Sequence, residues 1–387
     1  MSGVLFNESE LKFRKEVRKF VETELSPVSE EIERKEDFSL VREFIGKAGK
    51  RGYLGSTYPV KYGGTDKGMV YEIIFAEEVS AVNPGTDMSR AASSLFYSMP
   101  VYKFGTEEQK KKYLVPVIKG EKIGAIGITE PDVGSDTAGM KTKARPDGKD
   151  YIINGEKRFI TNGSQADFLC VFAITNTSVH PHEGMSAFIV EKGMSGFTPL
   201  KDYELLGQHG AKVSHLKFEN VRVPRENMIG KESEGFKVLM DELDRERVCI
   251  AAQALGYART PFEVAIKYST ERVQFDKKIK SFEGVSFKIA DAATKIEAAR
   301  LLTLQAARIL DKGLPATKEA TMAKVYSTET AFEVSSNALQ ILGGLGYTRE
   351  YPVERMLRDS RLMMIGGGTA EVLRFLIQRE IYKEFGY

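Results

Sequence analysis

A short glycine run near residue 367 is the segment of this chain best suited to bind a developing negative charge. Gly366-Gly367-Gly368 precedes Thr369 and a helical pattern. Glycine lets the backbone come close to a ligand, and a backbone N–H at such a place can stabilise an oxyanion. The run carries no acid or base, so proton transfer there needs a side chain from elsewhere.

Two glutamates are candidates for that side chain. Glu246 lies in Asp244-Arg245-Glu246-Arg247, inside a long helical pattern, and Glu371 stands four residues past Gly367. A glutamate beside an arginine on a helix commonly forms a solvated ion pair that contributes little. Residue type alone therefore does not choose between them.

Two further segments combine hydroxyl and aromatic side chains in a way that suits a ring-shaped cofactor. Thr129 and Ser135 belong to a Thr-Glu-Pro-Asp-Val-Gly-Ser-Asp segment, and Phe159 and Thr161 to an Arg-Phe-Ile-Thr-Asn-Gly segment. Hydroxyl groups can donate hydrogen bonds to a polar ligand, and an aromatic ring can stack on a planar one. Taken singly, each residue is also compatible with a loop or a core position.

Two more segments contain residues that can bind an anionic ligand. Arg272-Val273-Gln274-Phe275 contains an arginine whose rigid fork can engage two phosphate oxygens at once. Gln340 precedes Ile341-Leu342-Gly343-Gly344-Leu345-Gly346-Tyr347, whose glycines permit close backbone approach and would also end a helix.

Composition excludes several classes of protein. The 387 residues include 56 basic and 54 acidic side chains, a net charge of +2 that gives no reason to expect nucleic acid as a partner. The two cysteines lack CxxC spacing and the four histidines lack a metal-ligand pattern, so no metal is expected. Met1 to Val4 lead into a charged segment without signal or transit character, and no apolar run approaches the ~20 residues of a membrane span. A cytoplasmic protein is predicted.

The elements that would position these residues fall into three parts. Helical spacing dominates residues 1–120, β-branched alternation with turn residues dominates 121–229, and long helical patterns typical of a four-helix bundle occupy 230–387. Within the middle part, Asn154-Gly155 predicts a tight turn between two strands. We therefore predict an α+β fold of three domains: helical, β-barrel or sandwich, and helical bundle.

These motifs and their order resemble the acyl-CoA dehydrogenase family over essentially the whole chain. The Thr-Glu-Pro-x-x-Gly-Ser-Asp segment matches almost letter for letter. The resemblance implies FAD, an acyl-CoA substrate, electron-transfer flavoprotein as electron acceptor, and a homotetramer in which the Arg-x-x-Phe segment reaches a neighbour's flavin. The FAD contacts that it implies are Ile126, Ile128, Thr129, Phe159, Thr161, Arg272, Gln274, Phe275, Gln340, Gly343, Gly344, Thr369 and Glu371. For CoA it implies Ser135, Asp244 and Arg247.

The family motif near the flavin is commonly Tyr-Glu-Gly-Thr, in which Glu is the base, and Gly367 stands in its place. The isovaleryl-CoA and long-chain branches share this loss and carry the base on a bundle helix, which corresponds to Glu246 here. The resemblance thus predicts that Glu246 takes the α-proton while hydride leaves to flavin N5, with the Gly367 N–H holding the thioester oxygen. It predicts a branched, cyclic, or medium- or long-chain acyl group.

Two alternatives remain open at this point. Asp87 falls about where glutaryl-CoA-type members place an arginine, so it could serve as a second acid/base in 1,4-dehydrogenation of a cyclic enoyl-CoA such as cyclohex-1-ene-1-carbonyl-CoA; it could equally be a helix N-cap. The fold also includes flavin monooxygenases and binding or assembly proteins that have lost catalysis. Intact Thr129, Ser135 and Arg247 favour the dehydrogenase.

Overall fold

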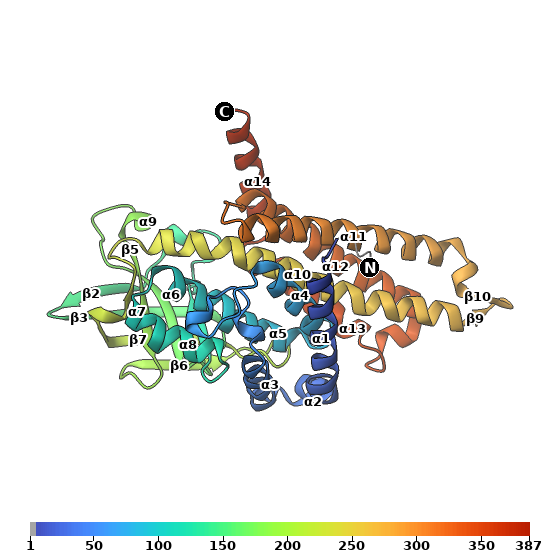
Figure 1. Ribbon diagram of the computed structural model, residues 1–387, viewed down its shortest axis with the longest axis horizontal. Coiled ribbons are helices and arrows are strands. Elements are labelled where there is room, and N and C mark those ends of the chain that lie inside the picture. The colour runs from blue at the N-terminus through green and yellow to red at the C-terminus, as the bar shows by residue number, and fades with distance from the viewer. Residues whose placement is uncertain (1–4) are drawn as a thin grey trace.

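The computed structural model describes residues 5–387 as a long body of three parts, with one helix projecting from it (Figure 1). Residues 1–4, for which we predicted no signal character, lie outside the described residues. No helix in residues 5–387 is long and apolar enough to cross a membrane. The predicted α+β class is confirmed by a central sheet between helical N-terminal and C-terminal regions.

The N-terminal part is helical. Its α-helices are α1 (Glu8–Glu24), α2 (Ser29–Lys35), α3 (Phe38–Lys50), α4 (Met69–Ser80), α5 (Pro84–Ala91), α6 (Ser98–Phe104), α7 (Glu107–Gln109) and α8 (Val115–Ile118). A π-helical segment, η4 (Ala92–Tyr97), joins α5 to α6. All of α4 except Tyr71 is buried, because α4 is packed between α1 on one side and α10 and α11 of the bundle on the other.

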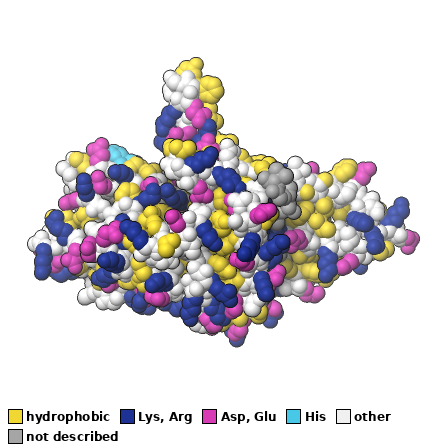
Figure 2. Space-filling view, in the orientation of Figure 1, with side chains coloured by type: hydrophobic (Ala, Val, Ile, Leu, Met, Phe, Trp, Pro, Cys, Tyr) yellow, Lys and Arg dark blue, Asp and Glu magenta, His cyan; other side chains and the backbone are white. Residues whose placement is uncertain are grey.

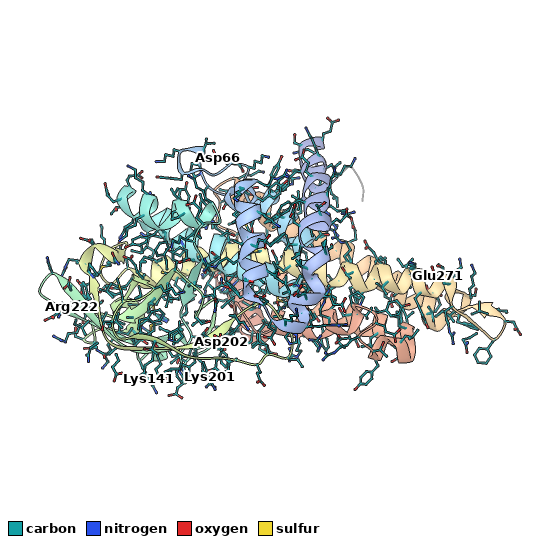
Figure 3. All side chains as sticks on the ribbon, turned by 90° about the horizontal axis from the view of Figure 1, so that it is seen from below. Asp66, Lys141, Lys201, Asp202, Arg222 and Glu271 are labelled. Atoms are coloured by element: carbon teal, nitrogen blue, oxygen red, sulfur yellow. The ribbon has the colours of Figure 1, made fainter. Side chains whose placement is uncertain are left out.

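The middle part is a β domain. Its strands are β1 (Gly124–Gly127), β2 (Lys143–Asp147), β3 (Asp150–Thr161), β4 (Phe168–Ile174), β5 (Met185–Glu191), β6 (Phe197–Asp202), β7 (Val213–Pro224) and β8 (Met228–Ile229), with a short helix α9 (Pro181–Gly184) before β5. They follow the order β6-β7-β3-β2-β4-β5-β8, and β1 pairs in parallel with β4. Seen from below, Lys141, Lys201 and Arg222 lie on this domain at one end of the molecule (Figure 3).

The predicted turn at Asn154-Gly155 is wrong. Both residues lie inside β3, which continues to Thr161, and the β2–β3 hairpin instead turns between Asp147 and Asp150, where Gly148 has φ +63°. At Gly155 the pairing with β7 shifts register, which marks a bulge. The Asn-Gly pair therefore signals a local irregularity that glycine permits, not a reversal of the chain.

The C-terminal part is a helical bundle. It consists of α10 (Gly235–Glu271), α11 (Glu283–Asp311), α12 (Thr317–Leu342), α13 (Val353–Met363) and α14 (Ala370–Glu384), with a small hairpin of β9 (Val273–Gln274) and β10 (Lys277–Lys278). The hairpin lies at the end of the molecule opposite the β domain, close to Glu271 (Figures 1 and 3).

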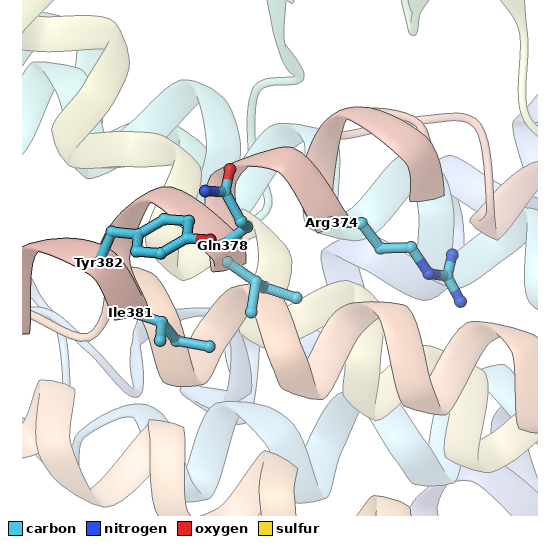
Figure 4. A pocket seen from close by; sticks show the side chains of 5 residues that line it. Arg374, Gln378, Ile381 and Tyr382 are labelled. Atoms are coloured by element: carbon cyan, nitrogen blue, oxygen red, sulfur yellow. The ribbon is translucent and has the colours of Figure 1, made fainter. Parts of the chain in front are cut away.

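Helix α14 stands out from the body and exposes apolar side chains (Figures 1 and 2). Phe375 is 67% exposed and Tyr382 51%. One face of α14 lines a hollow of about 330 Å³ with Arg374, Ile377, Gln378, Ile381 and Tyr382 (Figure 4). Apolar side chains that stay exposed add no stability to a monomer. Several of them on one element are typical of a site of association.

Candidate active site

The carboxylate of Glu246 occupies the space in front of Gly367. Glu246 projects from α10, and Gly367 lies in the loop between α13 and α14 with φ +65°. A Cβ atom on Gly367 would lie 3.0 Å from Glu246 Oε1 and 2.7 Å from Ile250 Cδ1, one helical turn further along α10. Glu246 is only partly exposed. The sequence-predicted pair, a base and a glycine in place of the usual acid, is thus in contact.

Lys324 of α12, which we did not single out in the sequence, fixes the glycine loop. Its buried Nζ donates to the carbonyl of Gly366 at 2.7 Å and to that of Gly368. The N–H of Gly367, between those two carbonyls, donates to no atom of residues 5–387. The loop is therefore pinned at both sides of the Gly367 and Gly368 N–H groups, neither of which has a partner in residues 5–387, and an oxyanion site needs free backbone donors of this kind.

The electrostatics of Glu246 suit a base. Burial raises the pKa of its carboxyl, while the neighbouring Glu242 side chain and the charges of Arg247 and Lys324 act in the opposite direction. Burial also disfavours the charged form of Lys324, and it lowers the pKa of this side chain to about 8. A carboxylate with a raised pKa is a stronger proton acceptor and, because two cations are near, it can still ionise.

Glu371, the rival base, has the opposite environment. It is exposed in the first turn of α14, where a hydrogen bond with its own backbone and the hydroxyl of Thr369 lower its pKa. Thr369 itself caps α14, because its Oγ1 accepts from the N–H of Val372. Glu371 is thus a weaker base than Glu246 and lies at a solvated helix start.

The predicted CoA residues lie near Glu246 on α10 and at a separate loop. Arg247 is 7% exposed and donates to Asp244 at 3.2 Å, but its Nε has no partner in residues 5–387. Asp244 also accepts from Thr317 at the start of α12. Ser135 is exposed in the loop after β1. An arginine with a spare, nearly buried donor retains capacity for an anionic or carbonyl ligand.

The predicted flavin-edge residues form one side of a surface on the β domain. Ile126, Ile128 and Thr129 are partly exposed in and after β1. Their segment is anchored from behind, because the buried ammonium of Lys157 donates to the Ile128 carbonyl at 3.0 Å and to Glu130 at 2.8 Å.

Phe159 and Thr161 border the same surface from β3. Phe159 is 54% exposed with φ +58°, at an irregularity in the β3–β7 pairing. Its ring centroid lies 4.9 Å from that of Tyr203, and the Arg158 guanidinium covers both rings. A non-glycine residue held in the left-handed region with an exposed aromatic ring is a common sign of a ligand site. More than half of the side chain is exposed, and its stacking on a flavin stays a prediction.

The predicted diphosphate residues lie at the end of the molecule opposite the β domain (Figure 1). Arg272, Gln274 and Phe275 are exposed on the β9–β10 hairpin, and Phe275 is 87% exposed. Gln340, Gly343 and Gly344 are exposed where α12 ends, and Cβ atoms on these two glycines would meet nothing within 4 Å. Since this end is opposite the β domain (Figure 1), one chain does not bring both sets of residues together.

Asp87 is part of a buried charge cluster. It is not the N-cap of α5, which is Asn83, whose side chain accepts from Thr86. The oxygens of Asp87 accept from Arg90 at 2.8 Å and from Gln253 of α10 at 2.9 Å, and Arg90 also pairs with Glu72. Burial raises the pKa of Asp87 to about 6. Both oxygens are therefore engaged by protein groups.

No group of histidine, cysteine and acidic side chains in residues 5–387 could hold a metal ion. The exposed aromatic ring, the partly exposed hydroxyls and the free loop amide fit a flavin and an acyl thioester instead.

The family models of the acyl-CoA dehydrogenase N-terminal, middle and C-terminal domains match residues 7–121, 125–221 and 233–382. The chain is 42% identical to the short-chain specific acyl-CoA dehydrogenase of Clostridium acetobutylicum, over 98% of this chain and 99% of that one. It is 39% identical to mitochondrial isovaleryl-CoA dehydrogenase of Pongo abelii, over 98% and 90%.

Solved structures agree with this relationship. The TM-score is 0.93 to butyryl-CoA dehydrogenase from Megasphaera elsdenii, 38% identical, covering 97% of this chain and 99% of that one. It is 0.94 to a chain of the structure described as electron transferring flavoprotein of Acidaminococcus fermentans, 42% identical, covering 97% and 98%. It is also 0.94 to an FAD complex of PigA, 28% identical, with the same coverage.

The fold and the site thus define a flavin-dependent oxidoreductase with FAD as cofactor. The chain belongs to the acyl-CoA dehydrogenase family.

Proposed function

We propose that this protein removes an α-proton and a β-hydride from an acyl-CoA thioester to give the 2-enoyl-CoA, with Glu246 as the base. The observation that carries the proposal is the closeness of the Glu246 carboxylate to Gly367, since a Cβ atom at position 367 would lie 3.0 Å from Glu246 Oε1. Bound FAD supplies the hydride acceptor.

The residues of this chain would divide the remaining work. The Gly367 N–H, held between two carbonyls that Lys324 binds, would donate to the thioester oxygen and stabilise the charge that develops there. Glu246 would then accept the α-proton. Thr129 and Thr161 would contact the flavin edge, Phe159 its face, and Arg247 with Asp244 and Ser135 the CoA.

The buried charged residues beside α10 favour a short or compact acyl group. Gln253 lies seven residues beyond Glu246, about 10 Å along the helix, and is tied to the buried cluster of Asp87, Arg90 and Glu72. An alkyl chain that followed α10 past Ile250 would have to bury methylenes against charged groups, which is unfavourable. A short, branched or cyclic acyl group avoids this cost, and a long straight chain does not. We therefore favour a compact substrate, even though long-chain enzymes also belong to the family branch that carries the base on a bundle helix.

Bleaching of the flavin tests this function. The purified protein, yellow and free of oxygen, would be mixed with butyryl-, isovaleryl-, cyclohexanecarbonyl-, octanoyl- and palmitoyl-CoA, without NADH. We expect rapid loss of the oxidised flavin absorbance with at least one of the first three and slow or no loss with palmitoyl-CoA. A flavin that bleaches with none of the five contradicts the dehydrogenase proposal.

We further propose electron-transfer flavoprotein as the electron acceptor and a homotetramer as the working form. The tetramer is supported by the distance between the hairpin residues and the β domain and by the apolar side chains of α14 (Figure 4). After reduction by substrate, reoxidation by electron-transfer flavoprotein should be much faster than reoxidation by dissolved oxygen. Comparable stopped-flow rates would instead indicate an oxidase.

Arg272→Ala should weaken FAD binding without disturbing the fold. The Arg272 side chain is exposed, and we propose that it binds the diphosphate of a neighbouring subunit's FAD. Losing such a charge-assisted pair should lower affinity about tenfold or more. Titration of the apoprotein with FAD measures the change, with Lys277→Ala on the same hairpin as the control. Equal affinities for the two variants would argue against a flavin contact.

Asp87→Asn tests the alternative 1,4-dehydrogenation. Because Arg90 and Gln253 already occupy both oxygens, we expect a structural effect: a loss of about 2 kcal/mol in unfolding free energy. Turnover of saturated and cyclic 1-enoyl thioesters should change by the same factor. A selective loss with the cyclic enoyl substrate would support Asp87 as a second acid/base.

A further inference from the structure

A second buried glutamate lies one helical turn before Glu246. Glu242 and Glu246 are four residues apart on α10, so their side chains are neighbours on one face of the helix. Glu242 is 1% exposed, and neither of its carboxyl oxygens receives a hydrogen bond from a donor group in residues 5–387. A buried carboxyl without a partner is costly, so this side chain requires a physical explanation.

The hydrogen bonds of the cations around the two glutamates go to other groups. On α10, Arg245 donates to Asp241 and Arg247 to Asp244. From α12, Lys324 faces Glu246 but its hydrogen bonds go to the glycine loop. From β4, the group near Glu242 is the thiol of Cys170, which is buried and pairs in register with Ile126.

The remaining partner of Glu242 is Glu246. Their four-residue spacing on α10 places the two carboxyls side by side, and two ionised carboxylates cannot form a hydrogen bond with each other because neither has a hydrogen to donate. Resting on the function proposed above, we propose that Glu242 is a positioning residue that keeps its proton and donates it in a hydrogen bond to the ionised carboxylate of Glu246.

The charges around the pair agree with this assignment. Burial, followed by the negative charge of Glu246, raises the pKa of Glu242 well above its ordinary value. The hydrogen bond from Glu242 lowers the pKa of Glu246, against the larger effect of burial. Like charges in one buried site push two carboxyls apart in this way, so that one stays protonated and the other ionises.

The proton count of the pair follows. At rest the two carboxyls hold one proton, on Glu242. When Glu246 takes the α-proton, the Cα–H bond breaks, an O–H bond forms on Glu246, and the pair holds two protons and no net charge. Glu242 does not touch the substrate in this step; it aims one oxygen of Glu246 and leaves the other free for the proton.

Infrared spectroscopy tests the protonation state without any turnover. At neutral pH, the difference spectrum of the wild-type holoenzyme minus Glu242→Gln should contain the carbonyl stretch of a protonated carboxylic acid, shifted in heavy water. A difference spectrum with only carboxylate bands would overturn the proposal. This result does not depend on whether Glu246 is the catalytic base, so the two claims can fail separately.

The pH profile of substrate-driven flavin reduction tests the hydrogen bond. Glu246 must be ionised to act, so the rate falls as the pH drops through its pKa. Glu242→Gln keeps an N–H donor and should leave this acidic limb within about half a pH unit of the wild type, whereas Glu242→Leu should move it upward by about one unit or more. FAD absorbance verifies that both variants are folded.

Three outcomes would overturn the proposal. An unmoved limb in Glu242→Leu means that no hydrogen bond supports Glu246. Equal upward shifts in both variants mean that the donor is not what matters. A downward shift in Glu242→Gln means that Glu242 is ionised in the wild type and opposes ionisation of Glu246 by its charge.

Discussion

Glu246→Gln should reduce the rate of flavin reduction by acyl-CoA about a thousandfold or more, while FAD remains bound. The substitution keeps the size and a hydrogen-bonding group but removes the only proposed acceptor for the α-proton, and general bases contribute about 10² to 10⁴ in rate. Anaerobic stopped-flow absorbance gives the rate, and the visible spectrum of the purified variant gives the FAD content.

Glu371→Gln is the matched control, since Glu371 is the other glutamate close to the glycine loop. It is exposed and its pKa is lowered, so its loss should change the rate of the FAD-loaded variant by no more than about threefold, and any effect of its predicted FAD contact should appear in the FAD content instead. If Glu371→Gln abolished flavin reduction and Glu246→Gln did not, the assignment of the base would have to be exchanged.

Gly367→Ala should also inactivate the enzyme, although it removes no functional group. The new Cβ would lie 2.7 Å from Ile250 Cδ1 and 3.0 Å from Glu246 Oε1, and a residue with a side chain is strained at φ +65° by about 1 kcal/mol. The Ile250 methyl, the Glu246 carboxylate or the loop must move, and a displacement of the base by about 1 Å costs on the order of 100-fold in rate. Steady-state kcat with the best substrate of the panel measures the effect.

The neighbouring Gly366→Ala variant separates this local effect from general damage to the loop. A Cβ on Gly366 would have its nearest neighbour, the Leu362 carbonyl oxygen, 4.0 Å away, and its φ lies outside the left-handed region. We expect activity within about threefold of the wild type. Equal losses of activity in the two variants would mean that the loop tolerates no substitution. The loss in Gly367→Ala could then not be attributed to the space between Gly367 and Glu246.

Much of the fold could be predicted from the sequence because apolar residues at helical spacing mark its long helices within short stretches of the chain. The 3.6-residue spacing from Phe236 to Tyr268 corresponds to α10, and that from Val285 to Asp311 to α11. Local turn chemistry was less reliable. Asn154-Gly155 has the composition of a hairpin turn, but its pairing with β7 makes it part of a strand, and a tertiary contact of this kind leaves no signal in a short window.

The candidate site shows the same division. Glu246 could be predicted as the base because Gly367 stands where the related family commonly has the acid, and such a replacement is visible in the sequence. Glu242 had a signal as well, since its spacing of four places it on the face of Glu246, but solvated glutamates with that spacing are common. For Lys324 the only signal in the sequence was a lysine between two apolar residues, Ala323 and Val325. Its hydrogen bonds to the glycine loop join residues 42 and 44 apart in the sequence, which a local pattern cannot show.

We propose above all that Glu246, from α10, takes the α-proton in place of an acid at position 367. Exchange of α-hydrogen for deuterium in heavy water tests it most directly, because it reports proton abstraction without hydride transfer. The wild type should exchange the α-hydrogens of its acyl-CoA, and Glu246→Gln, with its FAD bound, should not exchange them above the rate without enzyme. Exchange at the wild-type rate in Glu246→Gln would contradict the account, because another group would then be taking the proton.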